Sequence, residues 1–238
     1  MKFSYIIGYR QACESRRKNF EKVIENLEKN KSNFEVIVVE QDETQKLPGN
    51  LFYKHIFAYN KGLYNRSWAF NIGAKFSESN VLIFADCDIM IDFNDLQEAI
   101  EQCKAYDTID PKKRVIDYNE DGSLGAIRNG VVFSGGIVLI NKQAFYKVNG
   151  WDEEFVGWGG EDNAMTIKLH RFLTYKRLDF DVFHLYHNDR FTSAPRHEMY
   201  FRLNEAKWKN LEKMSNEQMI DKYKDVLIGD ENKYKEKT

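Results

Sequence analysis

Cysteine and long apolar runs are both scarce in this chain of 238 residues. It has only three cysteines, Cys13, Cys87 and Cys103. So small and scattered a set argues against a disulfide framework and favours a reducing compartment. The longest apolar run, at 130–140, is far shorter than a membrane span, and the first residues lack a signal-peptide pattern. We therefore expect a cytoplasmic protein with no transmembrane segment, with contact at a membrane surface left open.

An excess of charge of one sign is also lacking. With 35 basic and 37 acidic residues the formal net charge is −2, so nothing indicates a nucleic-acid partner. The chain contains no G-x-x-x-x-G-K-[ST] phosphate loop, no G-x-G-x-x-G fingerprint and no G-x-S-x-G elbow. The first two absences disfavour P-loop kinases and nicotinamide enzymes. What remains, 42% hydrophobic and 30% charged, is typical of a globular protein.

Apolar periodicity predicts the regular elements. Strands are expected at 2–8, 34–39, 54–59, 81–85 and 180–185, and at 131–140 with an interruption at Gly135-Gly136. One helix is expected from the stripe Phe20, Val23, Ile24 and Leu27, and a second over 67–76. Further helices are expected after a cap at Asn94 and from 199 onward, the last of them capped by Ser215 with Gln218 and carrying Met219, Ile220, Tyr223 and Val226.

This alternation of strands and helices predicts an α/β fold with a mixed, mostly parallel sheet flanked by helices. We expect one domain over residues 1–198 with a helical C-terminal extension over 199–238 packed on it. The polar stretch 108–129 is predicted to be a loop excursion. The charged end, 230–238, is predicted to be frayed.

Two aspartates, Asp86 and Asp88, come directly after the predicted strand 81–85. In an open α/β sheet, ligands bind at the carboxyl ends of the strands. Carboxylates one residue apart can hold a divalent cation together with a ribose or phosphate. Solvated acids at a capped strand end are the simpler alternative, and a second D-x-D occurs at Asp179-Phe180-Asp181. The position after a buried strand favours a functional role for Asp86 and Asp88.

A glycine-rich segment, G-W-G-G-E-D at 157–162, precedes another predicted helix. Glu161 and Asp162 would be stabilised at a helix N-terminus, which is sufficient reason for two acids there. Capping does not require Trp158 between glycines, however. An indole on a mobile loop beside a carboxylate suits a lid over a sugar, with the acid as general base.

Two of the five histidines, His184 and His187, lie three residues apart after a short predicted strand. In a chain that already offers an aspartate pair, they are candidate metal ligands. Zinc held with cysteines competes with this interpretation, but no C-x-x-C spacing accompanies them. A donor diphosphate would be neutralised by the metal and by basic side chains such as Arg10 or Arg66.

Four segments form a recognisable pattern in order and spacing: Y-N-R-S-W-A-F-N-I-G at 64–73, F-A-D-C-D at 84–88, F-S-G-G at 133–136 and G-W-G-G-E-D at 157–162. They resemble the motifs of the GT-A fold glycosyltransferases, in particular the β-1,4-galactosyltransferase family. Related bacterial family 2 enzymes that build capsule or surface polysaccharide are similar too. The resemblance runs from about residue 3 to residue 190, and the last segment matches letter for letter.

The resemblance implies a role for each matching residue. Asp88 and His187 would bind Mn²⁺ (or Mg²⁺), and His184, which stands where the galactosyltransferases have a Met, would be a further ligand. Asp162 would be the base of an inverting displacement, and Trp158, Glu161 and Asp162 would bind the acceptor or sugar. The UDP-sugar donor would be contacted by Arg10, Asp42, Tyr64, Arg66, Asp86, Gly135, Gly136 and Trp158.

The chain also departs from the family pattern. Its first motif, G-Y-R-Q-A at 8–12, matches only in part, and the membrane anchor and disulfides of the animal enzymes are absent from the sequence. The sugar, the glycan or glycoconjugate acceptor and the oligomeric state are not indicated. Two alternatives stay open: a sugar-phosphate nucleotidyltransferase, and a non-catalytic protein that binds nucleotide sugars or glycans.

Overall fold

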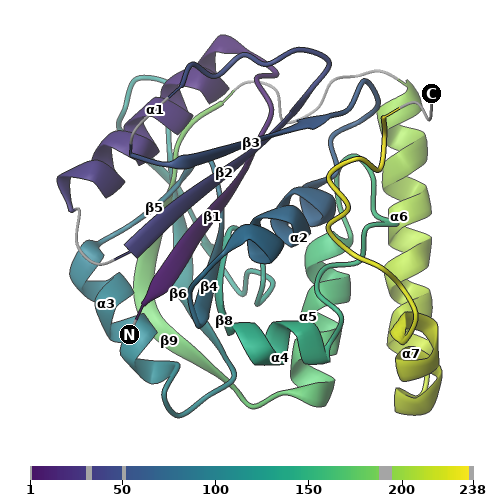
Figure 1. Cartoon of the computed structure of the whole chain (residues 1–238). Helices are drawn as coiled ribbons and strands as arrows, with labels where there is room; N and C mark the ends of the chain where they lie inside the picture. The colour runs from purple at the N-terminus through teal and green to yellow at the C-terminus, as the bar shows by residue number, and fades with distance from the viewer. Residues whose placement is uncertain (1, 31–33, 50–51, 188–194, 236–238) are drawn as a thin grey trace.

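The computed structural model describes residues 2–30, 34–49, 52–187 and 195–235 (Figure 1). The end of the predicted histidine segment, residues 188–190, lies outside the described residues. The strands are β1 (Phe3–Tyr9), β2 (Phe34–Asp42), β3 (Lys54–Tyr59), β4 (Val81–Asp86), β5 (Ile89–Ile91), β6 (Thr108–Tyr118), β7 (Leu124–Asn129), β8 (Ile137–Asn141) and β9 (Tyr175–His184). The helices are α1 (Glu14–Lys29), α2 (Arg66–Phe76), α3 (Phe93–Gln102), α4 (Lys142–Lys147), α5 (Glu161–Phe172), α6 (Pro195–Lys213) and α7 (Asn216–Tyr223).

In this described part, one nine-stranded sheet runs through the molecule in the order β3-β2-β1-β4-β8-β6-β9-β5, with β7 paired to β6. Helices α1 and α3 pack on one face, and α2, α4 and α5 on the other, each layer enclosing its own apolar core. The α/β architecture predicted from the alternation of elements is confirmed. Layers on both faces leave the carboxyl edge of the central strands as the place for a ligand.

We call β3-β2-β1-β4 the parallel half of the sheet, because these strands all run the same way. Every residue of β1 is buried, and β4 is buried except at its last residue, Asp86. Strands covered on both faces need continuous apolar sequence. The four strands predicted here are accordingly confirmed, with small differences at their ends.

We call β8, β6, β9, β5 and β7 the mixed half, because antiparallel and parallel pairings alternate in it. The predicted loop at 108–129 is wrong: these residues form the hairpin of β6 and β7. Its polar side chains pair with neighbours; Lys112, for example, is 1% exposed and bonds Asp110. Polarity therefore signals buried ion pairs here rather than a loop.

Two other boundaries in this region differ from the prediction. The strand expected at 131–140 begins only at Ile137, because Gly135 closes a turn onto Val132 and Gly136 has φ 74°. The third helix is capped by Asp92, whose carboxylate accepts from Asn94 N, and not by Asn94 itself. The strand is shortened by the turn at its glycines. The helix could have been capped by either of two polar residues, and tertiary packing selects Asp92.

The C-terminal helices pack on α5 through a small apolar cluster of Phe155, Ala164, Leu211, Met219 and Tyr223. The predicted cap of α7 is confirmed as a capping box of Ser215 and Gln218. Ile220 and Val226, expected on the same stripe as Met219, are instead 58% and 47% exposed. The apolar face of α7 is therefore narrower than its sequence suggests.

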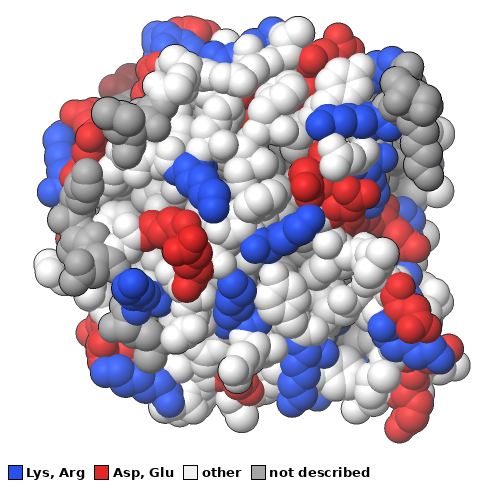
Figure 2. Space-filling model, viewed as in Figure 1, with Lys and Arg blue, Asp and Glu red and all other residues white. Residues whose placement is uncertain are grey.

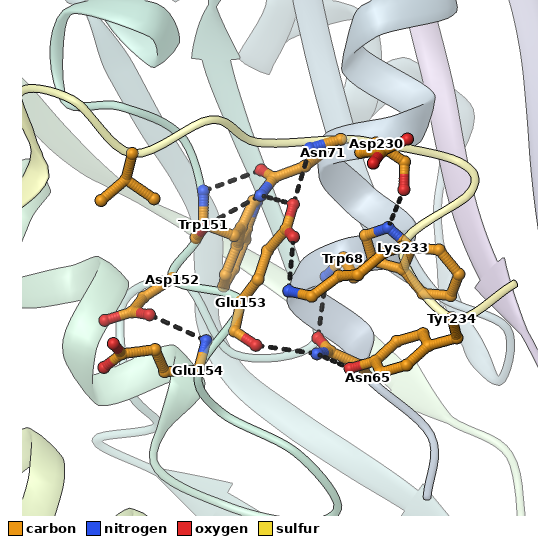
Figure 3. A network of polar contacts seen from close by, with 12 residues as sticks. Asn65, Trp68, Asn71, Trp151, Asp152, Glu153, Glu154, Asp230, Lys233 and Tyr234 are labelled. Atoms are coloured by element: carbon orange, nitrogen blue, oxygen red, sulfur yellow. Dashed lines mark hydrogen bonds and ion pairs between the residues drawn. The ribbon is translucent and has the colours of Figure 1, made fainter. Parts of the chain in front are cut away.

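The predicted fraying of the C-terminus is wrong for the described residues up to 235. Trp68 Nε1 donates to Asp230 O at 2.7 Å, and Lys233 Nζ lies 2.8 Å from Glu153 Oε2 (Figure 3). Asn65 Nδ2 donates to Tyr234 Oη at 3.3 Å. The Asp230 carbonyl and the Tyr234 hydroxyl dock this tail on the start of α2, and the charge of Lys233 docks it on Glu153. Sequence composition alone does not reveal these contacts.

The charged side chains of the described residues are interspersed on the face seen in Figure 2, where neither sign forms an extended patch. This distribution agrees with the near-zero net charge of the sequence. Among the described residues, no helix combines the length and apolar character needed to cross a bilayer.

Candidate functional site

Two elements bring the predicted metal ligands together at the seam between the two halves. Strand β4 ends at Asp86, and the turn through Asp88 leads into β5, which pairs with β9. The amide of Leu185, just after β9, donates to Asp88 O at 2.8 Å. The residues that follow β9 are thereby fixed beside the aspartate turn.

Asp88, His184 and His187 form a compact cluster whose potential ligand atoms all lie within 4.8 Å of one another. Asp88 Oδ2 lies 3.3 Å from His187 Nε2 and 3.9 Å from His184 Nε2. Asp88 is 3% exposed and His187 6%. A buried carboxylate with two imidazoles is a donor set suited to a divalent transition metal.

The second D-x-D of the sequence lies in a different environment. Asp179 pairs with Lys113 at 2.7 Å, and both side chains are largely exposed. Asp181 is held by both Arg114 Nε and Nη2. Surface ion pairing accounts for these two acids, whereas Asp88 lies in a buried cluster with two histidines. A functional role for Asp86 and Asp88 stays a prediction.

Two residues near the metal-ligating cluster were missed at the sequence level. Asp117, on β6, accepts a hydrogen bond from His184 Nδ1 at 3.0 Å. Arg16, in the first turn of α1, places Nη1 3.2 Å from Asp88 Oδ2. Asp117 lay in the stretch taken for a loop. The signal for Arg16 was its place just past the first strand, at the carboxyl edge of the sheet.

Arg66, the first residue of α2, gathers three carboxylates around one guanidinium. Its Nε donates to Asp86 and its Nη1 to Asp162, and Glu161 lies 3.9 Å away. The guanidinium also stacks over the ring of Phe70, 4.6 Å from its centroid. Arg66 thereby joins the end of β4 to the start of α5. Its position is set by Asn65, whose side chain caps α2.

Burial shifts the proton affinities of this acid cluster. Desolvation, together with the charge of Asp162, raises the pKa of Glu161 to about 8. Desolvation also raises the pKa of Asp86 to about 6, with Arg66 opposing and Asp88 reinforcing the shift. Burial alone would lower the pKa of Arg66, but Asp162, Asp86 and Glu161 together raise it. Glu161 is therefore mostly protonated at neutral pH and can donate a hydrogen bond.

The glycines of the G-W-G-G-E-D segment have backbone conformations that residues other than glycine rarely adopt. Gly157, Gly159 and Gly160 have φ of 77°, 93° and 89°. The resulting turn leaves Trp158 55% exposed and stacked on Phe201 of α6, with ring centroids 5.1 Å apart. A groove of about 290 Å³ lies between this turn and α6. It is lined by Val132, Trp158, Gly159, Gly160, Glu161, Asp162, Asn163, Phe201, Glu205 and Trp208.

The turn of Gly135 and Gly136 separates the two parts of the site. Gly136 O accepts from Asp86 N at 2.9 Å. A Cβ added at Gly135 would come within 3.4 Å of Asp162 Oδ2. Gly136 is therefore tied to the aspartate turn, and Gly135 lies beside the base candidate.

The remaining predicted donor residues lie at the neighbouring strand ends. Arg10 donates to the carbonyls of Gln41, Asn60 and Gly62, so its described hydrogen bonds serve the loops of the parallel half. Asp42 ends β2 and accepts from the amide of Glu43. Tyr64 lies beneath the Arg10 guanidinium, 5.9 Å from Cζ to ring centroid. Their contact with a nucleotide stays a prediction.

Sequence comparisons place part of this chain beside known galactosyltransferases. A family model described as the N-terminal domain of galactosyltransferase matches residues 128–188. β-1,4-Galactosyltransferase 4 of Homo sapiens is 30% identical over 112 residues, which cover 44% of this chain and 29% of that protein. The Rattus norvegicus protein is 31% identical over 116 residues, or 45% of this chain and 30% of its own length. The match thus spans less than a third of these curated relatives.

Solved structures extend the likeness to most of the fold. The catalytic domain of Drosophila β-1,4-galactosyltransferase 7 with xylobiose superposes with a TM-score of 0.56 at 16% identity, covering 84% of this chain and 79% of that one. A mutant of the same enzyme was solved with manganese, UDP-Gal and xylobiose. TarS of S. aureus gives a TM-score of 0.57 at 15% identity, covering 78% and 60%. The chain has the GT-A fold and resembles the β-1,4-galactosyltransferases, as its motifs predicted.

Proposed function

We propose that this chain is an inverting, metal-dependent glycosyltransferase that moves a sugar from a UDP-sugar onto a hydroxyl of a glycan or glycoconjugate. One observation carries the proposal. A metal-ligating cluster around Asp88 and an acid cluster around Arg66 lie on the two sides of one short turn, residues 86–88. A leaving group and an attacking hydroxyl need such neighbouring sites.

The metal would be held by Asp88, His187 and His184, whose carboxylate and imidazole atoms suit Mn²⁺. When bound, the ion would supply positive charge to the diphosphate that leaves with the nucleotide. Arg16 lies close enough to Asp88 to add a second positive charge on that side. We propose for Arg16 the neutralising role that the sequence had suggested for Arg10 or Arg66.

Asp162 would take the proton of the acceptor hydroxyl as its oxygen attacks the anomeric carbon. Arg66 Nη1 holds one carboxylate oxygen of Asp162, while Asp162 Oδ2 lies beside Gly135, close enough that a Cβ added there would contact it. The neutral carboxyl of Glu161 would donate a hydrogen bond to a sugar hydroxyl, which an ionised acid cannot do. We therefore assign the base role to Asp162 and the donor role to Glu161.

Polar atoms without partners support a ligand at this place. Arg66 Nη2 and Glu161 Oε2 are buried with no hydrogen-bond partner among the described residues. Such atoms cost free energy unless water or a ligand satisfies them. Hydroxyls of a bound sugar could accept from Arg66 and pair with Glu161. Both atoms belong to the acid cluster, where the reacting sugar would lie.

The acceptor would bind in the groove between the glycine turn and α6. Trp158 and Phe201 present stacked aromatic faces there, and Trp208 lines the same groove. Aromatic faces pack against the apolar face of a pyranose, while Asp162 at the groove floor would meet its hydroxyl. Trp158 would then act as a lid residue over the bound sugars.

A screen of UDP-sugars tests this proposal directly. Mn²⁺-stimulated hydrolysis, or thermal stabilisation that needs both Mn²⁺ and the sugar nucleotide, is expected for one or a few UDP-sugars, with UDP-galactose tested first. Pyrophosphate release from UTP and a sugar phosphate would instead identify a nucleotidyltransferase. Stabilisation by UDP-sugars with neither hydrolysis nor transfer to any glycan would identify a binding protein.

A further inference from the structure

We infer that Asp117 is a positioning residue for His184, so that the hairpin of β6 and β7 supplies the outer shell of the metal centre. The inference rests on the metal-dependent function proposed above. It assigns a role to the stretch 108–129, which no sequence motif marked. Three observations carry it: the bond to His184, the register of the strands and the support from β7.

Asp117 contacts the ring of His184 on the side away from Asp88. Its Oδ1 lies 3.0 Å from His184 Nδ1, whereas His184 Nε2 is the ring atom that faces Asp88 Oδ2. A carboxylate can only accept, so this bond places the proton of His184 on Nδ1. The lone pair of Nε2 is then directed toward the metal-ligating cluster, which is the arrangement that a metal requires.

The backbone fixes this contact. Asp117 and His184 are direct partners in the parallel pairing of β6 with β9. On its other side, the β6–β7 register shifts between Ile116 and Tyr118, at Asp117 itself. An irregularity of this kind turns a side chain out of the regular alternation. The carboxylate is thereby directed across the strand toward the imidazole.

A cation from β7 holds the carboxylate in place. Arg128 Nη2 donates to the same Oδ1 at 2.8 Å. The side chains of Asp117 and His184 are 11% and 12% exposed, so solvent screens their bond only weakly. The chain of contacts runs Arg128, Asp117, His184 and then Asp88. Each residue in it limits the rotation of the next.

Outer-shell partners of metal-bound histidines typically contribute about 10–100-fold to metal affinity. We therefore expect Asp117→Ala to weaken Mn²⁺ binding by about tenfold or more. Asp117→Asn keeps an acceptor oxygen without the charge and should fall between the wild type and the alanine variant. Neither substitution removes an atom that would touch the metal, so the effect reports orientation of His184.

Mn²⁺ affinity, measured from the free-ion EPR signal during titration, tests the inference without any assay of transfer. The matched control is Asp181→Asn, which removes a carboxylate bound by Arg114 across the same two strands. Its Mn²⁺ affinity should equal that of the wild type. The double variant His184→Ala/Asp117→Ala completes a thermodynamic cycle, with thermal unfolding recorded for every protein.

If Asp117 acts through His184, adding Asp117→Ala to His184→Ala causes no further loss of Mn²⁺ affinity. Equal losses on both backgrounds, or wild-type affinity in Asp117→Ala, would overturn the inference. Failure of the metal centre itself is distinguished by Asp88→Asn. If that variant binds Mn²⁺ as tightly as the wild type, the proposed function fails as well, whereas its loss of binding beside an unaffected Asp117→Ala rejects only the positioning role.

Discussion

The two halves of the sheet differ in how well their secondary structure can be predicted from the sequence. In the parallel half, β1 and β4 are nearly continuous apolar runs, because helices cover both faces. In the mixed half, β6 contains Asp110, Lys112 and Arg114, and its two cations bond across strands to β8 and β9. Apolar periodicity therefore predicts the first half well, whereas in the second half it finds only part of the strands and misreads β6 and β7 as a loop.

The candidate site lies where these halves meet, and its residues likewise differ in how well the sequence predicts them. Asp86 and Asp88 follow a strand that the sequence identifies, so their placement could be predicted. Asp117 and its bond to His184 depend on a strand that the sequence does not identify. Motifs thus locate the candidate metal ligands, whereas the residues proposed to orient them depend on strand register.

Arg66 shows a second limit of sequence reasoning. The sequence suggested a phosphate ligand, yet the guanidinium binds Asp86, 20 residues away, and Asp162, 96 residues away. Pairings at this separation are made by the tertiary fold, and no local pattern encodes them. The sequence does show that one basic residue and three acidic residues lie at the predicted ends of strands and helices.

The largest expected effect concerns Asp162, which Arg66 links to the parallel half. Asp162→Asn should reduce transfer by about 10²–10⁴-fold, because a general base contributes about that much. UDP binding, measured by calorimetry, should stay within a few-fold of the wild type. Asp179→Asn, in the exposed D-x-D, is the matched control and should retain full transfer. Full transfer activity in Asp162→Asn would mean that Asp162 is not the general base.

The buried polar character of the mixed half can be tested with two adjacent lysines. Lys112 is 1% exposed and bonds Asp110 Oδ1, Phe133 O and Ile137 O, whereas Lys113 pairs with Asp179 in solvent. Lys112→Met should cost about 3 kcal/mol of unfolding free energy, because the buried Asp110 keeps only Arg177 as a cation and two buried carbonyls lose their donor. Lys113→Met should cost less than about 1 kcal/mol.

Urea unfolding of both lysine variants measures this contrast. Equal, small losses would mean that β6 tolerates unpaired charge as a loop does, and the interpretation of β6 as a buried strand would fail. The expected difference corresponds to a fall in Tm of about 10 °C for Lys112→Met, at about 2–4 °C per kcal/mol in a protein of this size.

A smaller effect is expected from the protonation of Glu161 at the seam. Its pKa is raised from 4.5 to about 8 on folding by burial and by Asp162. An acid with a raised folded pKa stabilises the fold fully below its unfolded pKa, and this contribution is lost as the pH rises through the folded pKa. The Tm advantage of Glu161→Gln over the wild type should therefore grow by a few degrees between about pH 5 and pH 8.5.

Calorimetry across this pH range, with Glu154→Gln as control, isolates the effect. The Glu154 side chain is 63% exposed, so its replacement should give the same pH profile as the wild type. Parallel profiles for Glu161→Gln and the wild type would mean that Glu161 is ionised in the fold, and its proposed role as a hydrogen-bond donor would be lost.

The smallest expected effect tests whether the C-terminus is docked or frayed. This is the second region where composition gave a wrong prediction. Lys233 reaches Glu153, whose side chain is 7% exposed and which also accepts from Asn71 Nδ2 and Gly229 N (Figure 3). Because those donors remain, Lys233→Met should cost only about 1 kcal/mol, and exposed Lys235→Met nothing measurable. A frayed tail would make the two variants equal. A difference in Tm of about 2–4 °C would instead show that the tail stabilises the start of α2, and with it the position of Arg66.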